Sequence, residues 1–322
     1  MKRAMLAALL TLLMMTAGCA GGAPAPEPKN QSVLLGFAQL GSESAWRVGN
    51  SASIKQAADA AGVQLMFENA EQKQEKQIKA LRSFIAYQVD VIAFAPIVED
   101  GWDNVLLEAK AAGIPVLTTD RMIVTEQQDL YAGFVGSDFY QEGVRAGEFL
   151  IKKTGGRSSV NIVEISGTLD STPMRQRARG FRDVIAGDPR FHIVDSLSGD
   201  FLRSKGKERM EQLLDRYENI DVLYSHNDGM TLGAIEAIEA RGIRPGTDIV
   251  IITVDGEQAA INLLKEGKIN CVVECTPLIG DTVMRLAKRL AAGETIPRMT
   301  YSDEQVFTEF DGNLDSLPAR GY

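Results

Sequence analysis

The stretch from residue 89 to residue 120, VDVIAFAPIVEDGWDNVLLEAKAAGIPVLTTD, decides the fold. It begins and ends with short runs that are apolar almost throughout, VDVIAFAP (89–96) and IPVLTTD (114–120). Between them, WDNVLLEAKAAG (102–113) has the apolar spacing of a helix. Strands that are apolar on both faces are typical of a parallel sheet covered by helices on each side. The stretch therefore predicts a strand–helix–strand unit of an α/β fold.

The same alternation continues on both sides of this unit. Before it come the strand-like SVLLGFA (32–38) and VQLMFEN (63–69) and the helical EKQIKALRSFIAYQ (75–88). After YAGFVGSD (131–138) a second series of strand-like runs begins, with helical stretches between them: SVNIVEIS (159–166), FHIVDSLSG (191–199), VLYSHND (222–228), DIVIITVDG (248–256) and NCVVECT (270–276). Two series with one pattern predict two doubly wound, Rossmann-like domains joined by crossover strands.

The restart of the pattern also predicts where the domains divide. We place the first boundary near Ser137 and Asp138, and we expect the chain to return to the first domain after about Thr276. The first lobe is then predicted to contain residues 33–137 and 276–303. The second is predicted to contain residues 138–275 and 304–322. A hinge between them would lie in the crossovers near Ser137, Thr276 and Asp303.

The N-terminus has the pattern of an export signal. Lys2 and Arg3 precede the apolar run AMLAALLTLLMM, and TAGC follows. This TAGC resembles a bacterial lipobox, although Thr16 stands where leucine is usual, so residues 1–18 are predicted to be a signal peptide and Cys19 a lipidated cysteine. Residues 19–32, rich in Pro, Gly and Ala, are predicted to be a tether. An ordinary cleaved signal with an unrelated cysteine is the alternative.

Composition excludes several classes of function. The net charge of −9, with scattered basic residues, argues against a nucleic-acid surface. Cys271 and Cys275 are four strand residues apart, too far for a disulfide, and are predicted to be buried free thiols. With two histidines no zinc cluster is expected, and no phosphate loop, dinucleotide fingerprint or nucleophile elbow occurs. We expect no catalytic residues, metal or cofactor, although a glycosidase-like carboxylate pair stays open.

Polar and aromatic side chains follow the carboxyl ends of the predicted strands, where open α/β sheets bind ligands. They are Glu43, Trp46 and Arg47 in the loop after the first strand, Asp120, Arg121, Phe201, Asn227 and Asp255 after later strands, and Arg177 near the start of a helix. Each has an ordinary explanation, as a helix cap, a solvated arginine or a core aromatic. Together, however, carboxylates, arginines, an amide and flat apolar faces suit an uncharged, polyhydroxylated ligand.

Several long strings resemble those of one family. GSESAWR (41–47), QKQEKQIKALRSF (72–84), APIVEDGW (95–102), SGDFLRSKGKE (198–208) and SHND (225–228) are similar to the periplasmic sugar-binding proteins of ABC transporters, in the ribose-binding branch of the type I fold and most of all its galactofuranose-binding members. The resemblance runs from about Val33 to the end of the chain. It implies that Trp46 is an aromatic wall with Arg47 beside it and that Asp120 and Arg121 grip ring hydroxyls. It further implies that Arg177, Phe201, Asn227 and Asp255 contact the sugar from the second lobe.

Two departures from ribose binders put ribose itself in doubt: Cys275 replaces a glutamine and Val254 replaces an aromatic residue. The resemblance implies a monomeric binding protein in the periplasm or at the extracytoplasmic membrane face. The lipobox-like TAGC, which is a further difference from many relatives that are freely soluble in the periplasm, adds the expected lipid anchor. The protein would capture galactofuranose or a related hexose or pentose by hinge closure and deliver it to a membrane permease. A sugar-sensing component for chemotaxis or a sensor kinase is the alternative. A sugar-responsive repressor shares the fold, but the chain lacks an N-terminal helix-turn-helix.

Overall fold

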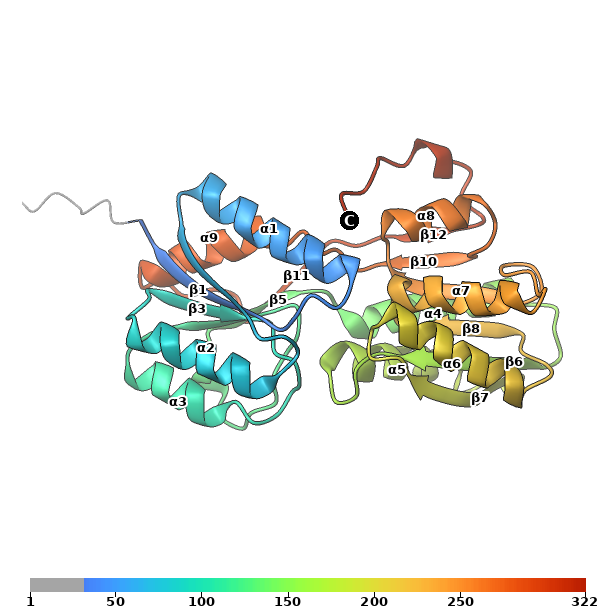
Figure 1. Ribbon diagram of the computed structural model, residues 1–322, viewed down its shortest axis with the longest axis horizontal. Coiled ribbons are helices and arrows are strands. Elements are labelled where there is room, and N and C mark those ends of the chain that lie inside the picture. Colours follow the sequence, from blue (N-terminus) through green and yellow to red (C-terminus); the bar gives the residue numbers. More distant parts are fainter. Residues whose placement is uncertain (1–31) are drawn as a thin grey trace, which may run out of the picture. The chain divides into compact units, whose positions relative to one another are not determined.

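A computed structural model describes residues 32–322, which contain two six-stranded sheets (Figure 1). The predicted signal peptide, Cys19 and the tether up to residue 31 lie outside the described residues. We call each sheet with its covering helices a lobe. The predicted α/β class with two doubly wound sheets is confirmed.

The first lobe contains a wholly parallel sheet in the order β11-β5-β4-β3-β1-β2. Its strands are β1 (Leu34–Gln39), β2 (Gln64–Asn69), β3 (Val91–Phe94), β4 (Val116–Thr119), β5 (Gly133–Gly136) and β11 (Met299–Tyr301). Its helices are α1 (Ala45–Ala61), α2 (Gln74–Ala86), α3 (Asp103–Ala111) and α9 (Gly280–Ala291), with the short helix η1 (Gln128–Leu130). In Figure 1, α1 and α9 cover one face of the sheet, and α2 and α3 cover the other.

The second lobe repeats this plan in the order β12-β10-β9-β8-β6-β7, and only β12 runs antiparallel to its neighbour. Its strands are β6 (Val160–Ser166), β7 (Phe191–Ser198), β8 (Val222–Ser225), β9 (Val250–Asp255), β10 (Cys271–Glu274) and β12 (Val306–Thr308). Its helices are α4 (Phe139–Lys153), α5 (Thr172–Ile185), α6 (Arg203–Arg216), α7 (Asp228–Ala240) and α8 (Gln258–Lys265), with η2 (Leu314–Ser316) near the end of the chain.

Each face of each sheet has its own apolar core. In the first lobe, Ile54 and Val283 belong to the core under α1 and α9, and Phe84 and Trp102 to the core under α2 and α3. Two further cores lie under α4 with α5 and under α6, α7 and α8. Burial on both faces explains why nearly every parallel strand is apolar throughout rather than alternating.

One boundary differs from the prediction. Trp46 and Arg47 were predicted to lie in a loop before the next helix, but α1 already begins at Ala45. The cause is Ser44, whose hydroxyl accepts a hydrogen bond from the backbone N–H of Arg47 at 3.1 Å and so caps the helix. Trp46 and Arg47 therefore lie in the first helical turn, which fixes their side-chain directions more firmly than a loop would.

The chain passes between the sheets three times: after β5, after β10, and between β11 and β12. Ser137, Thr276 and Asp303 lie in these three crossovers. That the two lobes move as separate bodies with the boundaries given above stays a prediction. Cys271 and Cys275 are both free and buried, as predicted.

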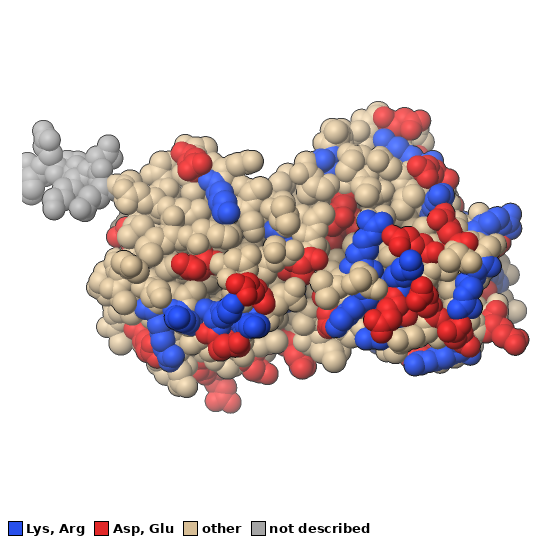
Figure 2. All heavy atoms as spheres, in the orientation of Figure 1, with Lys and Arg blue, Asp and Glu red and all other residues tan. Residues whose placement is uncertain are grey.

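The surface carries both signs of charge. On the face shown in Figure 2, acidic and basic side chains alternate over α6 and α7, where Arg203 and Lys207 both pair with Glu236. Such intermixing leaves no continuous basic patch on this face of the kind that meets a phosphate backbone. Among residues 32–322, no helix is both long enough and apolar enough to cross a membrane.

Candidate functional site

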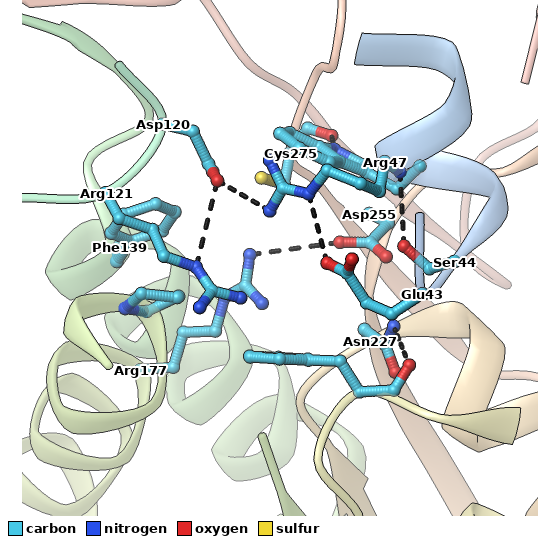
Figure 3. Close-up of a pocket in the computed structure, with 13 residues that line it drawn as sticks. Glu43, Ser44, Arg47, Asp120, Arg121, Phe139, Arg177, Asn227, Asp255 and Cys275 are labelled. Carbon is cyan, nitrogen blue, oxygen red and sulfur yellow. Dashed lines mark hydrogen bonds and ion pairs between the residues drawn. The ribbon is translucent and has the colours of Figure 1, made fainter. Parts of the chain in front are cut away.

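One pocket between the two lobes brings the predicted site residues together (Figure 3). All nine predicted ligand-binding residues line it: Glu43, Trp46, Arg47, Asp120, Arg121, Arg177, Phe201, Asn227 and Asp255. Ser44, Phe139, Pro173 and Cys275 line it as well. The pocket lies beyond the carboxyl ends of β1, β4, β8 and β9, where a parallel α/β sheet leaves a crevice.

On the first-lobe side, Arg47 holds the carboxylates in place. Its Nε lies 3.0 Å from Glu43 and its Nη2 lies 2.7 Å from Asp120, and the arginine side chain is 3% exposed. Arg121 donates to the carbonyl of Ile97 at 2.9 Å. Burial alone would lower the pKa of Arg47, but Asp120 and Glu43 outweigh it and raise that pKa. This network keeps the charges paired inside a pocket that excludes most water.

On the second-lobe side, Arg177 has the same central role. It contacts Glu142 at 2.6 Å, donates to the carbonyl of His226 at 2.5 Å, and lies 3.9 Å from Asp255. Asn227 caps α7 by accepting from the N–H of Met230 at 2.9 Å, so the ordinary explanation for an asparagine after a strand also holds. A side-chain amide can cap a helix with its oxygen and still offer its NH₂ to a ligand.

Three aromatic rings bound the pocket. The indole N–H of Trp46 donates to the carbonyl of Cys275 at 2.6 Å, which fixes the ring between α1 and the crossover after β10. The Phe201 ring lies 5.3 Å from the Arg121 guanidinium, across the two lobes. Gly167 makes room for this ring, because a Cβ there would lie 1.9 Å from it. Phe139 faces Arg177 at 5.3 Å.

The backbone is strained at three lining residues. Asp120, Phe201 and Asp255 have φ values of 59°, 61° and 124°, in a region that side chains with a Cβ seldom adopt. Strain of this kind persists where the surroundings hold it, and it concentrates at functional sites. Next to Asp255, the N–H groups of Gly256 and Glu257 both donate to Asp228 at 2.7 Å, which holds the turn.

Charge is nearly balanced within the pocket. Burial, and then the neighbouring Arg47, lower the pKa of Arg121 to about 10, so it stays protonated at neutral pH. Burial raises the pKa of Asp255 well above its usual range, against the opposing effect of Arg177. Each lining arginine therefore faces at least one carboxyl group within 4 Å, and the pocket offers no unpaired cation to an anionic ligand.

The lobes touch at the mouth of the pocket. The Thr172 hydroxyl accepts from the N–H of Met122 and donates to its carbonyl, both at 3.1 Å, and the N–H of Glu99 donates to the carbonyl of Asp170 at 3.2 Å. The pocket has a volume of about 320 Å³, and most of its lining residues are buried. A ligand therefore enters only if the lobes separate or the lining side chains move.

Four lining residues were not predicted as ligand contacts. Ser44 caps α1, and Pro173 stands in the first turn of α5, so both belong to the helix starts that border the crevice. Phe139 begins α4 directly after the first crossover, where its apolar character suggested only core. Cys275 was predicted to be a buried free thiol and was noted as a replacement for glutamine in ribose binders. Its place directly after β10 was the available signal.

Comparison with known protein families gives a match over residues 35–295 to the model of the periplasmic binding protein domain. The chain belongs to the periplasmic binding protein family. The resemblance seen in the sequence is confirmed. A curated relative, the galactofuranose-binding protein YtfQ of Escherichia coli (strain K12), is 40% identical over 266 residues, which are 82% of this chain and 83% of that protein.

Solved structures agree. A protein from Mycobacterium smegmatis in complex with β-D-fucofuranose is 47% identical with a TM-score of 0.86, covering 88% of this chain and 93% of that one. The periplasmic component of the arabinose ABC transporter from Shewanella sp. ANA-3, bound to α- and β-L-arabinofuranose, is 40% identical with a TM-score of 0.84, covering 88% and 94%. These relatives of the periplasmic binding protein family are binding proteins and not enzymes, which confirms the expectation that the chain has no catalytic role.

Proposed function

We propose that this protein binds a neutral monosaccharide in its furanose form in the pocket between the lobes and delivers it to an ABC-transporter permease. One observation carries the proposal: polar and aromatic side chains from both lobes, with their charges paired, line a single pocket at the carboxyl ends of the strands. A hydroxyl group can accept from an arginine and donate to a carboxylate at the same time, whereas an ionised carboxylate group of a ligand can only accept.

The three relatives described above support a furanose. Those proteins are described as binding galactofuranose, β-D-fucofuranose and L-arabinofuranose, respectively. For this chain galactofuranose is the first candidate, with Trp46, Phe139 and Phe201 against the faces of the ring and Arg47, Asp120, Arg177, Asn227 and Asp255 at its hydroxyls. Hinge movement in the three crossovers would open and close the pocket.

Isothermal titration calorimetry tests the ligand. We expect saturable binding of galactofuranose, D-fucose or L-arabinose, weaker binding of D-galactose locked as its methyl pyranoside, and no binding of galacturonate. The sugar must be recovered unchanged. Tightest binding of the locked pyranoside would exclude the furanose form, and a preference for galacturonate would contradict the neutral ligand.

Delivery to a permease and membrane anchoring belong to the same proposal. The relative from Shewanella is the periplasmic component of an arabinose ABC transporter, and the family is extracytoplasmic. Deletion of the gene should abolish uptake of the sugar that calorimetry identifies. Retained uptake together with lost chemotaxis or sensor-kinase output would favour the signalling alternative instead.

The anchor depends on Cys19. Replacing it by alanine should move the protein from the membrane fraction to the soluble extracytoplasmic fraction, because a cysteine thioether carries the acyl chains. Metabolic labelling with a palmitate analogue checks the change, with Cys271→Ala as the control that keeps the label. A labelled Cys19→Ala protein would contradict lipidation at this residue.

A further inference from the structure

The three crossovers meet at one carboxylate. Glu304 lies in the third crossover, and its Oε1 accepts hydrogen bonds from the hydroxyl of Ser137 in the first crossover and, at 2.9 Å, from the N–H of Thr276 in the second. The Ser137 hydroxyl also lies 3.3 Å from the sulfur of Cys275. A single carboxyl group therefore joins all the segments through which the chain passes between the lobes.

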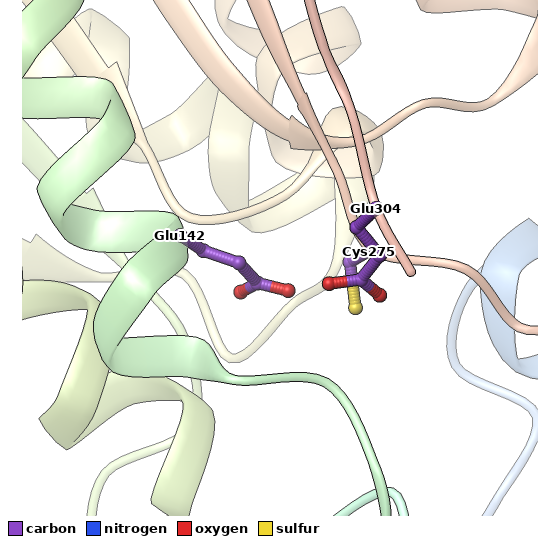
Figure 4. Close-up of side chains that lie close together, drawn as sticks. All are labelled: Glu142, Cys275 and Glu304. Atoms are coloured by element: carbon purple, nitrogen blue, oxygen red, sulfur yellow. The ribbon is translucent and has the colours of Figure 1, made fainter. Parts of the chain in front are cut away.

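Two more potential ligands lie beside it (Figure 4). Glu142, in the first turn of α4, and Cys275 place one oxygen and one sulfur so that these atoms and a Glu304 oxygen all lie within 4.8 Å of one another. Glu142 is 0% and Cys275 2% exposed, whereas Glu304 is partly exposed. The cluster is thus closed on one side and reachable from solvent on the other.

Only one of the two oxygens of the Glu142 carboxylate has a polar partner. Its Oε2 contacts Arg177 at 2.6 Å, but its Oε1 is buried and has no hydrogen-bond partner. In Figure 4 the carboxylate points toward Cys275 and Glu304. An unpaired buried carboxylate oxygen is costly, and a cation in the space between the three side chains would remove that cost.

We propose that Glu142, Cys275 and Glu304 form a binding site for a zinc-like divalent cation at the junction of the crossovers. A thiolate with two carboxylates suits Zn²⁺ or Co²⁺ and disfavours Mg²⁺ and Ca²⁺, which take oxygen ligands only. The fourth tetrahedral position faces the exposed side and is left to water. The sequence analysis expected no metal because histidines are scarce, but this ligand set uses none.

Charge and orientation fit such an ion. A dication would be balanced by the Glu304 carboxylate and the Cys275 thiolate, while Glu142 stays balanced by Arg177. Ser137 and Thr276 orient Glu304 as the outer hydrogen bonds of metal sites commonly do. Of the three ligands, Cys275 also lines the sugar pocket, whereas Glu142 and Glu304 lie outside it.

Cobalt absorption tests the site. The untagged Cys19→Ala chain, in which Cys271 and Cys275 are the only thiols, is stripped with a chelator and titrated with Co²⁺. We expect one equivalent to bind, with a thiolate-to-cobalt charge-transfer band in the near ultraviolet and displacement by Zn²⁺. If Co²⁺ binding is detected only above about 100 μM metal, the proposal is overturned.

Two variants and a matched control identify the ligands. Cys275→Ser should abolish the charge-transfer band, and Glu304→Gln should weaken Co²⁺ binding about 10- to 100-fold. Cys271→Ser removes the other buried thiol, four residues earlier, and should keep both band and affinity. A band that survives Cys275→Ser overturns the proposal. Circular dichroism of each variant shows that a lost band is not lost folding.

Discussion

Arg177 is the residue on which the second-lobe half of the pocket depends, because it contacts Glu142, the carbonyl of His226 and Asp255 together. We predict that Arg177→Lys weakens sugar binding by more than about tenfold, since a lysine cannot replace the planar fork of donors. Calorimetry measures the change. Arg179→Lys, two residues along the same helix and 75% exposed in its side chain, should bind like the parent. Equal affinities for the two variants would contradict the assignment.

Below the pocket, a buried pair makes stability depend on pH. His226 lies 3.1 Å from Glu164, which also receives Arg182 at 2.6 Å. Burial lowers the pKa of His226, against the hydrogen bond to Glu164 that raises it. Burial alone would raise the pKa of Glu164, but His226 and Arg182 outweigh it and hold that pKa below its usual range.

Both shifts have the same sign for stability. A base or an acid whose pKa is lower in the folded state contributes stability above its unfolded pKa and loses it as pH falls. The free energy of unfolding, measured with urea at about pH 7.5 and about pH 5.5, should therefore be lower at the acidic pH. His226→Asn should reduce that loss by about 1 kcal/mol. His192→Asn, at the exposed second histidine, should keep the parent's loss. An unchanged loss in His226→Asn would contradict this role.

Residue identities in the pocket were predictable where a strand end exposes a polar group. All nine predicted residues line it, but their partners were not predictable. The pairing of Arg177 with Glu142 joins two helices, and the contact of Trp46 with Cys275 spans 229 positions in the chain. Periodicity describes neighbours along the chain, whereas these contacts depend on how elements pack.

At the scale of elements, α4 and α5 approach each other unusually closely. A Cβ at Gly143 would lie 2.2 Å from the carbonyl oxygen of Arg177, and one at Gly180 would lie 2.1 Å from that of Tyr140. These are backbone atoms, which cannot move aside as a flexible side chain can. The two glycines therefore set the spacing at which α4 presents Glu142 to Arg177.

We predict that Gly143→Ala lowers the free energy of unfolding by about 1–3 kcal/mol, the cost of overpacking. It should also weaken sugar binding, because α5 carries Arg177. Urea denaturation and calorimetry measure the two effects. Gly187→Ala, just after α5 and with nothing within 4 Å of the added atom, should leave both nearly unchanged. A stable Gly143→Ala protein would show that the helices can separate freely.

The order and type of elements followed from the sequence because parallel strands buried on both faces are apolar throughout. The start of α1 did not, since the apolar Trp46 hid the cap made by Ser44. Burial of Trp46 beside the second lobe is a tertiary effect. The antiparallel β12 was also unexpected, because three residues carry too little periodicity to predict a strand direction.

At the scale of the whole described unit, a threonine beside the pocket joins the lobes. Thr172 makes two hydrogen bonds to Met122, one to its N–H and one from its hydroxyl to the carbonyl. Thr172→Val keeps the side-chain shape and removes both. We predict about a 30-fold loss of sugar affinity, seen as faster dissociation, since each of the two hydrogen bonds contributes about 1 kcal/mol.

Surface plasmon resonance separates the two rate constants. Thr125→Val is the matched control, because Thr125 bonds only within its own lobe, to residues 127 and 128. A Thr172→Val protein with the parent's dissociation rate would mean that these two hydrogen bonds do not oppose opening.

The two tryptophans lie in different surroundings. Trp102 is sealed in the core of the first lobe, where its indole N–H donates to the carbonyl of Val98 and its ring packs against Phe94. Trp46 stands at the meeting point of α1, the pocket and the second crossover. Indole fluorescence depends on the immediate surroundings of the ring. The emission of Trp46 therefore depends on how far apart the lobes are, while that of Trp102 stays constant. The fluorescence of Trp46 should therefore change when the lobes open. Trp102→Phe would remove the constant emission of the other tryptophan from the measured signal.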